Sequence, residues 1–113
     1  MVGVSIDDIN SFQRNGVVVI RNLLDTNQVE ELAEAIDWNI DNPSHLGQTA
    51  SRNTDPGHFF EDFCNWQRIP AYSKIIFDSD IGSIAASLMG SEEVRLFHDH
   101  MLVKEPATKQ PTP

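Results

Sequence analysis

The chain has 113 residues, 40% of them hydrophobic, which fits one globular domain rather than a disordered segment. Its 17 acidic residues outnumber its 8 basic ones and give a formal charge of −9. A net negative surface repels phosphate backbones and anionic lipids, so we expect neither nucleic-acid nor membrane partners. No apolar run approaches the roughly 20 residues that cross a bilayer, and no signal-peptide pattern opens the sequence, so we expect a cytoplasmic protein.

The sequence contains one cysteine, Cys64. A single cysteine cannot form an internal disulfide, and it suits a reducing compartment. Because Phe63 and Trp66 are its neighbours, we expect a buried structural thiol rather than a reactive one.

A helix and a short strand are the first elements that the pattern predicts. Ser5 can cap the helix with its hydroxyl, two acidic residues follow near the positive end of the helix dipole, and Gly16 can end the helix. The apolar residues that share one face of it are Ile6, Ile9 and Phe12. The β-branched run from Val17 to Ile20 then predicts a strand.

An amphipathic helix is predicted next. Asp25 or Thr26 can cap it, and Pro43 closes it. Apolar residues recur at helical spacing: Val29, Leu32, Ala33, Ile36 and Ile40. Acidic residues occupy the wet side: Glu30, Glu31, Glu34 and Asp37.

The middle of the chain combines a loop with an aromatic segment. Residues 42–57 are polar and contain two prolines and two glycines, which predicts a loop. The following segment carries four aromatic side chains: Phe59, Phe60, Phe63 and Trp66. We expect these side chains to form a wedge of the core beneath the loop, and a substrate-binding surface is the alternative.

Two more helices are predicted before the last strand. Pro70 suits the first turn of one helix, which carries apolar side chains at Tyr72, Ile75, Ile76 and Phe77. Ser79 or Asp80 can cap the other helix, and Gly90 ends it. The apolar positions of this last helix are Ile81, Ile84, Ala85 and Leu88.

The segment from Val94 to Val103 alternates as a strand should, and we expect it to be the longest strand of the protein. Residues two apart on a strand point the same way, so His98 and His100 can converge on one metal ion, whereas Asp99 points the opposite way. A pair of core or hydrogen-bonded histidines is the alternative interpretation. Together with Gly90 and Glu105, the pair loosely resembles the ligand pattern of cupin folds, although the gap from Gly90 to His98 is longer than in cupins.

Four segments carry a second and more extensive resemblance. They are residues Phe12 to Ile20, the capped helix from Thr26 to Ile40, the strand and turn from Phe97 to Pro106, and the pair Thr112-Pro113. In this order they resemble, over nearly the whole chain, the phytanoyl-CoA dioxygenase family of iron(II)- and 2-oxoglutarate-dependent oxygenases. The resemblance implies an α+β fold, with an N-terminal helical layer and the first strands of a double-stranded β-helix (jelly roll) that is incomplete.

The resemblance also implies a site for iron(II) and 2-oxoglutarate in the intact enzyme, which would hydroxylate a small organic substrate. Members similar to this chain continue past the Thr-Pro pair into a His-x-Asp motif, which binds iron together with a later histidine. No His-x-Asp pair occurs here. We therefore expect residues 1–113 to be the N-terminal part of a single oxygenase domain, truncated before the iron motif and inactive alone. By resemblance, Met101 borders the 2-oxoglutarate pocket and Lys104 lies near the same strand end.

Two other functions stay open from the sequence. One is a cupin-like metal-binding module that uses His98, His100 and Glu105. The other is a non-catalytic interaction domain. Because part of a jelly roll leaves sheet edges unpaired, we also expect this chain to be marginally stable alone or to form a homodimer along the strand near His100.

Overall fold

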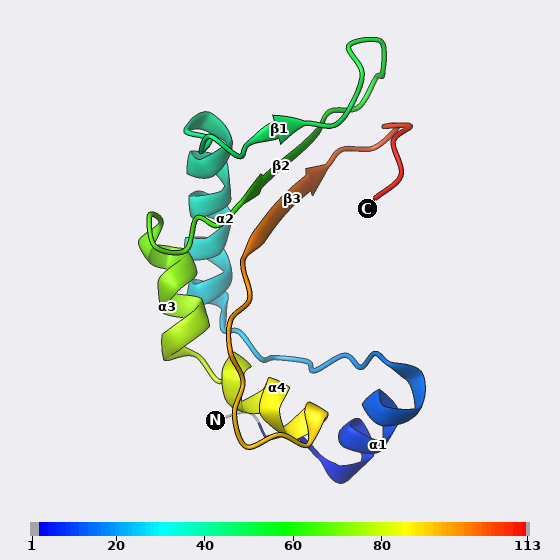
Figure 1. Ribbon diagram of the computed structural model, residues 1–113, viewed down its shortest axis with the longest axis vertical. Coiled ribbons are helices and arrows are strands. Elements are labelled where there is room, and N and C mark those ends of the chain that lie inside the picture. Colours follow the sequence, from blue (N-terminus) through cyan, green and yellow to red (C-terminus); the bar gives the residue numbers. More distant parts are fainter. Residues whose placement is uncertain (1–2, 113) are drawn as a thin grey trace.

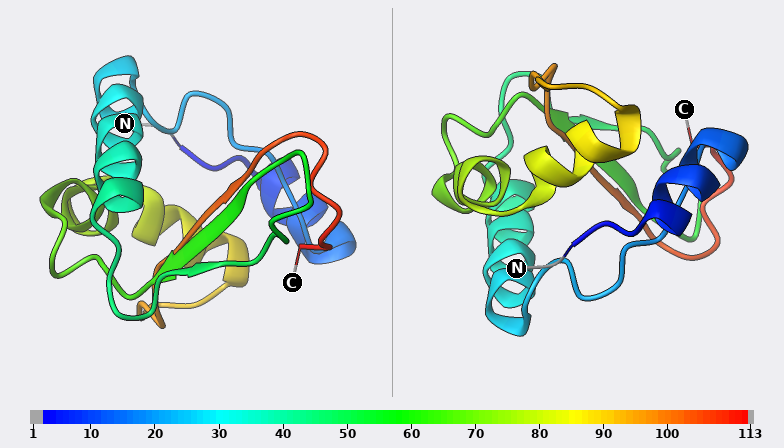
Figure 2. Two further views of the ribbon diagram at one scale, coloured as in Figure 1. Left: turned by 90° about the horizontal axis from the view of Figure 1, so that it is seen from above. Right: turned by 90° about the horizontal axis from the view of Figure 1, so that it is seen from below.

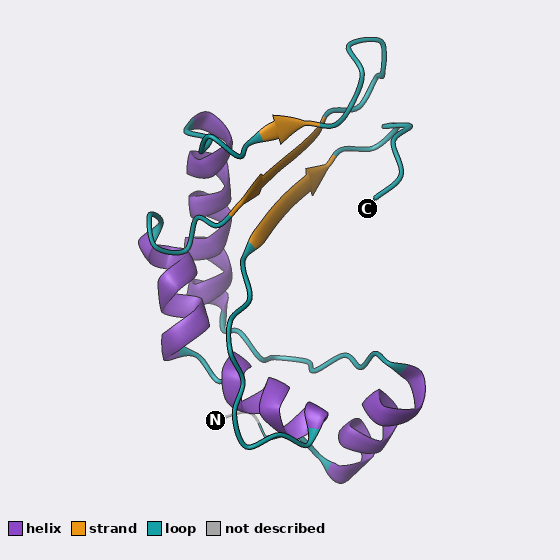
Figure 3. Ribbon diagram, in the orientation of Figure 1, coloured by secondary structure: helices purple, strands orange, loops and turns teal. Residues whose placement is uncertain are grey.

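A computed structural model describes residues 3–112, and this part of the chain combines helices with a small antiparallel sheet (Figures 1 and 3). In chain order the elements are α1 (Ile6–Asn15), α2 (Thr26–Asp41), β1 (Gln48–Thr49), β2 (Phe59–Phe63), α3 (Pro70–Asp78), α4 (Ile81–Met89) and β3 (His100–Lys104). The α+β class is therefore confirmed. None of these helices is long and apolar enough to cross a membrane. Pro113, the second residue of the Thr112-Pro113 pair, lies outside the described residues.

The first two helices begin and end where the sequence predicts. Ser5 caps α1 by accepting a hydrogen bond from the Asp8 backbone, and the Asp8 carboxylate accepts one from the Ser5 backbone in return. Asp25 and Gln28 form the same reciprocal box at the start of α2. Gly16 ends α1 with a φ of 73°, a conformation that glycine adopts without steric cost.

The third and fourth helices also confirm their predictions. Pro70 occupies the first turn of α3, where its missing N–H needs no partner. The Asp80 backbone carbonyl accepts the first hydrogen bond of α4, and the Ser79 hydroxyl accepts one from the Ile81 backbone. Gly90 ends α4 in the left-handed conformation.

The aromatic segment forms β2, the central strand of the order β1-β2-β3. Phe59 and Phe60 are buried, as the predicted core wedge requires. The strand pairs Phe63 with His100 and Asp62 with Met101 across an antiparallel register. The segment lacks the clean apolar–polar alternation of a half-buried strand, because its two acidic side chains, Glu61 and Asp62, are buried as well.

The predicted strand from Val17 to Ile20 is wrong. These residues form a connection without regular structure, and the side chains of Val17 and Val19 are both 65% exposed. β-Branched residues favour a strand only where a neighbouring strand supplies hydrogen bonds and packing. No such neighbour pairs with this segment within residues 3–112.

The last strand is half as long as predicted. It begins at His100 instead of Val94, and it has the same length as β2. The reason lies in its partner: β2 ends at Phe63, and Cys64 then turns the chain away with a φ of 59°. The alternating residues before Asp99 have no strand to pair with, and Phe97 is 92% exposed.

The helices divide into two groups around the sheet. Helices α2 and α3 stand to one side of the sheet (Figure 2). The buried apolar cluster lies between them and consists of Ala35 of α2, Tyr72 of α3 and Ile69, the residue before α3. Helices α1 and α4 lie together at the far end, joined by a hydrogen bond from the Gln13 side chain to the Leu88 carbonyl (Figure 1). The radius of gyration is 16.2 Å, above the about 13 Å of a compact domain of this length. The fold therefore leaves much apolar surface uncovered.

A buried carboxylate joins α2, the following loop and β2. The Asp62 side chain is 0% exposed. It accepts hydrogen bonds from the Asn39 side chain at 2.9 Å, from the Ser44 backbone at 2.8 Å and from the Ser44 hydroxyl. Tyr72 of α3 extends this network by donating its hydroxyl to Asn39 at 3.0 Å. Burial and the charges of Asp99 and Asp62 raise the pKa of Tyr72 to about 12, so the phenol stays a donor.

The network keeps Asp62 ionised. Burial alone would raise the pKa of this carboxyl, but the hydrogen bonds from Ser44, Asn39 and the Phe63 backbone outweigh it and lower the pKa to about 2. Because the folded-state pKa lies below the unfolded value of 3.8, Asp62 stabilises the fold above that value. The stabilisation is lost as the pH falls from 3.8 toward 2.

We expect Asp62→Asn to lower the free energy of unfolding at neutral pH by about 2–3 kcal/mol, because an amide turns one acceptor into a donor that faces other donors. Urea unfolding at a series of pH values measures this. The difference between wild type and variant should shrink as the pH falls through 3.8. Asp41→Asn, at the exposed end of α2, is the control and should change little. A cost equal to that of the control would contradict the role given to Asp62.

The outer edge of β3 is unpaired among the described residues, because β3 ends the sheet. Hydrogen bonds from Glu105 N to His58 O and from Cys64 N to Asp99 O show that the odd-numbered residues face β2. Leu102 therefore directs its backbone N–H to the open edge. An open edge of this kind is a template for another strand.

We expect the chain to self-associate through this edge, with sedimentation coefficients that rise with concentration. Leu102→Pro removes the outward N–H without breaking the ladder to β2, so it should shift the protein to monomer. Leu102→Ala keeps the N–H and should still associate. A wild-type chain that sediments as a monomer at every concentration would refute the edge contact.

Candidate functional site

Both histidines of the His-Asp-His sequence lie against one aromatic ring. The centroid of the Phe63 ring is 4.0 Å from that of His100, in a stacked arrangement, and 6.3 Å from that of His98. His98 also meets the exposed ring of Phe97 at 4.8 Å. The two histidines therefore share a side of the chain, as their spacing predicts.

His100 is paired with a buried carboxylate. Its Nε2 lies 3.1 Å from Oε2 of Glu61, whose side chain is only 7% exposed. The other oxygen of Glu61 accepts a hydrogen bond from the Gln48 side chain. One residue from each of the three strands thus contributes to this polar cluster, which we call the Glu61 cluster (Gln48, Glu61 and His100).

Asp99 points away from the two histidines and has a structural task. Its two carboxylate oxygens accept hydrogen bonds from the backbones of Asn65 at 3.0 Å and Trp66 at 2.9 Å. Its carbonyl accepts one from Cys64 at 3.0 Å. Asp99 therefore holds the left-handed turn that ends β2 and leads into α3.

Glu105 does not approach the histidine pair. Its side chain accepts a hydrogen bond from the His58 backbone at 2.9 Å, and its own N–H donates to the His58 carbonyl. The three predicted cupin-like ligands are thus not brought together. Within residues 3–112, no group of three or more His, Cys, Asp or Glu side chains is arranged to hold a metal.

The residues of this chain do not fit an iron(II) site. The Nε2 atom of His100 faces Glu61, both oxygens of Asp99 hold backbone N–H groups, and Glu105 is engaged at the start of β2. A metal would have to break each of these interactions to gain a ligand. The facial arrangement of two histidines and one carboxylate is therefore not available from this strand.

Met101 and Lys104, the two residues that resemblance places near 2-oxoglutarate, point to opposite faces of β3. Met101 is buried and borders an apolar cavity of about 190 Å³ between β3, α2 and α3, with Leu32, Ile36 and Ile75 in its lining. Lys104 is exposed on the other face, with its ammonium 5.4 Å from the centroid of the Phe59 ring and 3.2 Å from the Thr112 hydroxyl. The two side chains therefore lie on different sides of the sheet.

The prediction that the thiol of Cys64 is buried is wrong. Its side chain is exposed because the residue adopts the left-handed turn at the end of β2, and it lines a shallow surface depression beside Phe63 and His98. Neighbouring aromatic residues in the sequence predicted burial, but the turn directs the thiol outward.

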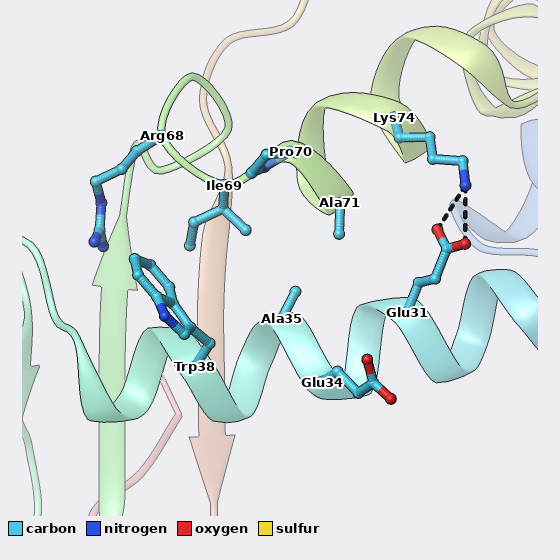
Figure 4. Close-up of a pocket in the computed structure, with 9 residues that line it drawn as sticks. All are labelled: Glu31, Glu34, Ala35, Trp38, Arg68, Ile69, Pro70, Ala71 and Lys74. Carbon is cyan, nitrogen blue, oxygen red and sulfur yellow. Dashed lines mark hydrogen bonds and ion pairs between the residues drawn. The ribbon is translucent and has the colours of Figure 1, made fainter.

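A second hollow, of about 610 Å³, lies between α2 and the start of α3 (Figure 4). Ala35 and Ala71 point toward each other across it, and because both side chains are small, the space between the two helices stays open. Lys74 closes one end through an ion pair with Glu31 at 2.7 Å, and this carboxylate raises the pKa of the ammonium. At the other end the Arg68 guanidinium lies 5.2 Å from the centroid of the Trp38 ring.

Comparison of this chain with models of known protein families, with curated proteins and with solved structures finds no match.

Sequence reasoning missed the Glu61 cluster. Glu61, the partner of His100, lies 39 positions before it, and Gln48, the partner of Glu61, lies 52 positions before His100. Their proximity depends on strand pairings that the sequence does not specify. The one signal present was the sequence Phe59-Phe60-Glu61-Asp62-Phe63, in which two acidic residues inside an aromatic run indicate buried partners for both.

We expect Asp99→Ala to lower the free energy of unfolding by about 1–3 kcal/mol, because it leaves the N–H groups of Asn65 and Trp66 without acceptors. Chemical unfolding followed by tryptophan fluorescence measures the loss. Asp37→Ala, an exposed change on α2, should cost far less. If the two variants unfold alike, Asp99 does not hold the turn.

Proposed function

We propose that this chain forms the helical layer and first strands of an iron(II)- and 2-oxoglutarate-dependent oxygenase similar to the phytanoyl-CoA dioxygenase family. The intact enzyme would hydroxylate a small organic molecule. The iron ligands would come from residues that these 113 do not include, because the chain has no His-x-Asp pair and its histidines do not fit the metal.

One observation carries the proposal. The segment from Phe97 to Pro106, which most resembles the family, contains β3, the edge strand of an antiparallel sheet backed by helices. An unpaired edge is where the sheet of a jelly roll would be extended by further strands. The α+β arrangement and the capped helix α2 are compatible with the same proposal.

Under this proposal the residues described here build the scaffold and one wall of the site. Asp62 and Tyr72 fix the sheet on α2 and α3, and Asp99 sets the turn that precedes α3. The outer face of the sheet, opposite to α2, would then face the interior of the completed jelly roll.

The test is to sequence the coding DNA downstream of codon 113 and to assay the encoded protein. We expect a His-x-Asp motif soon after Pro113, and iron(II)-dependent formation of succinate from 2-oxoglutarate that disappears when the motif histidine is replaced by alanine. A reading frame without this motif, or a longer protein that forms no succinate, would refute the proposal.

Iron(II) binding by the 113-residue chain distinguishes the oxygenase proposal from the cupin-like alternative. We expect the chain to bind iron(II) under anaerobic conditions no better than a variant with both His98→Ala and His100→Ala, and to form no succinate. Micromolar binding that the double variant loses would instead support a metal-binding module.

An interaction domain is the second candidate, and one observation favours it. Three apolar side chains in the segment before β3 are exposed: Val94, Leu96 and Phe97. Exposed apolar patches mark contact surfaces. A gene that ends at codon 113 and a chain that self-associates would together support this candidate over the enzyme.

A further inference from the structure

The Glu61 cluster lies on the face of the sheet that the helices do not cover. Asp62 is hydrogen-bonded to Asn39 of α2, and its strand partner Met101 borders the cavity between β3, α2 and α3. Side chains alternate along a strand, so those of Glu61 and His100 point to the opposite side. A carboxylate with 7% exposure on this face is stabilised by partners from both adjacent strands. Removing a carboxylate from water costs free energy, so the burial of Glu61 does not by itself stabilise the fold.

Glu61 fixes the role of each nitrogen of His100. An ionised carboxylate only accepts hydrogen bonds, so the Nε2 atom at 3.1 Å must carry a proton. In neutral imidazole the other nitrogen, Nδ1, is then an acceptor. The Phe63 ring, stacked at 4.0 Å, restricts rotation of the imidazole. The side chain of His100 is 27% exposed, so part of its ring is accessible to solvent.

A shallow depression of about 620 Å³ borders the Glu61 cluster. It is lined by Leu46, Gln48, Phe63, Cys64, Phe97 and His98. Gln48 belongs to both the depression and the cluster, and Phe63 stacks on His100. Apolar and aromatic side chains thus surround a few polar atoms, which is the usual composition of a site for a small organic ligand.

We infer that Glu61 and His100 form a carboxylate–imidazole dyad that binds a hydroxyl group through Nδ1 of His100. The ligand is a small molecule that carries this hydroxyl on an apolar or aromatic body, which packs on Phe63 and in the adjoining depression. The site consists entirely of residues of this chain, so it does not depend on the oxygenase proposal, and either can fail without the other.

Two probes of nearly equal shape test the dyad. p-Cresol carries the hydroxyl, and 4-methylanisole replaces it with a methoxy group that cannot donate. Both are titrated into the 113-residue protein at about pH 8, above the ordinary histidine pKa of about 6.5. Nuclear magnetic resonance follows the ring nitrogens of His100, assigned with His100→Gln. We expect p-cresol to shift Nδ1 and to bind about fivefold more tightly than 4-methylanisole.

Variants separate the dyad from a structural pair. Glu61→Gln and His100→Gln should abolish the preference for p-cresol, whereas His45→Gln, an exposed histidine outside the depression, should keep it. The wild-type comparison decides the matter even if a site variant does not fold. Equal binding of the two probes, no binding of p-cresol, or a free His100 protonated on Nδ1 would overturn the inference.

Discussion

The burial of Asp62 is the interaction on which the rest of this structure depends. A fully buried carboxylate is tolerated only where several donors converge on it, and here they come from α2, from the loop after α2 and from β2 itself. These contacts fix the distance between helix and strand and the rotation of the strand about its axis. Because side chains alternate along β2, placing Asp62 on the helix side places Glu61 on the outer side.

The position of Asp62 also determines which side chains of the sheet face the helices and which face away from them. On the helix side, Met101 is buried and borders the apolar cavity between β3, α2 and α3. The outer side carries Glu61 and His100, which pair with each other and contact Gln48 and Phe63 of the neighbouring strands. The polar groups of the Glu61 cluster and the unpaired edge of β3 are therefore the parts of the sheet that the helices leave accessible.

Local signals in the sequence predicted the helices, because capping residues and apolar spacing act over a few positions. Ser5, Asp25 and Gly16 each determine a helix boundary through contacts with residues at most four positions away. The strands depend on distant partners, and there the sequence failed: Val17 to Ile20 has the composition of a strand but no neighbour, and the alternation from Val94 exceeds the length of β2. The pairing of Glu61 with His100 belongs to the same class, since it exists only once β2 and β3 are in register.

The His-Asp-His sequence shows why spacing alone does not identify a metal site. Alternation correctly placed the two histidines on one side and Asp99 on the other, yet a ligand also needs a free lone pair. Asp99 has both oxygens engaged by the turn after β2, and the Nε2 of His100 is engaged by Glu61. Nδ1 of His100 has no hydrogen-bond partner among the described residues, and it is an acceptor when Nε2 donates to Glu61. A single oriented acceptor beside an apolar depression suits a hydrogen-bond donor on an organic molecule better than a cation, which would require several ligands to converge.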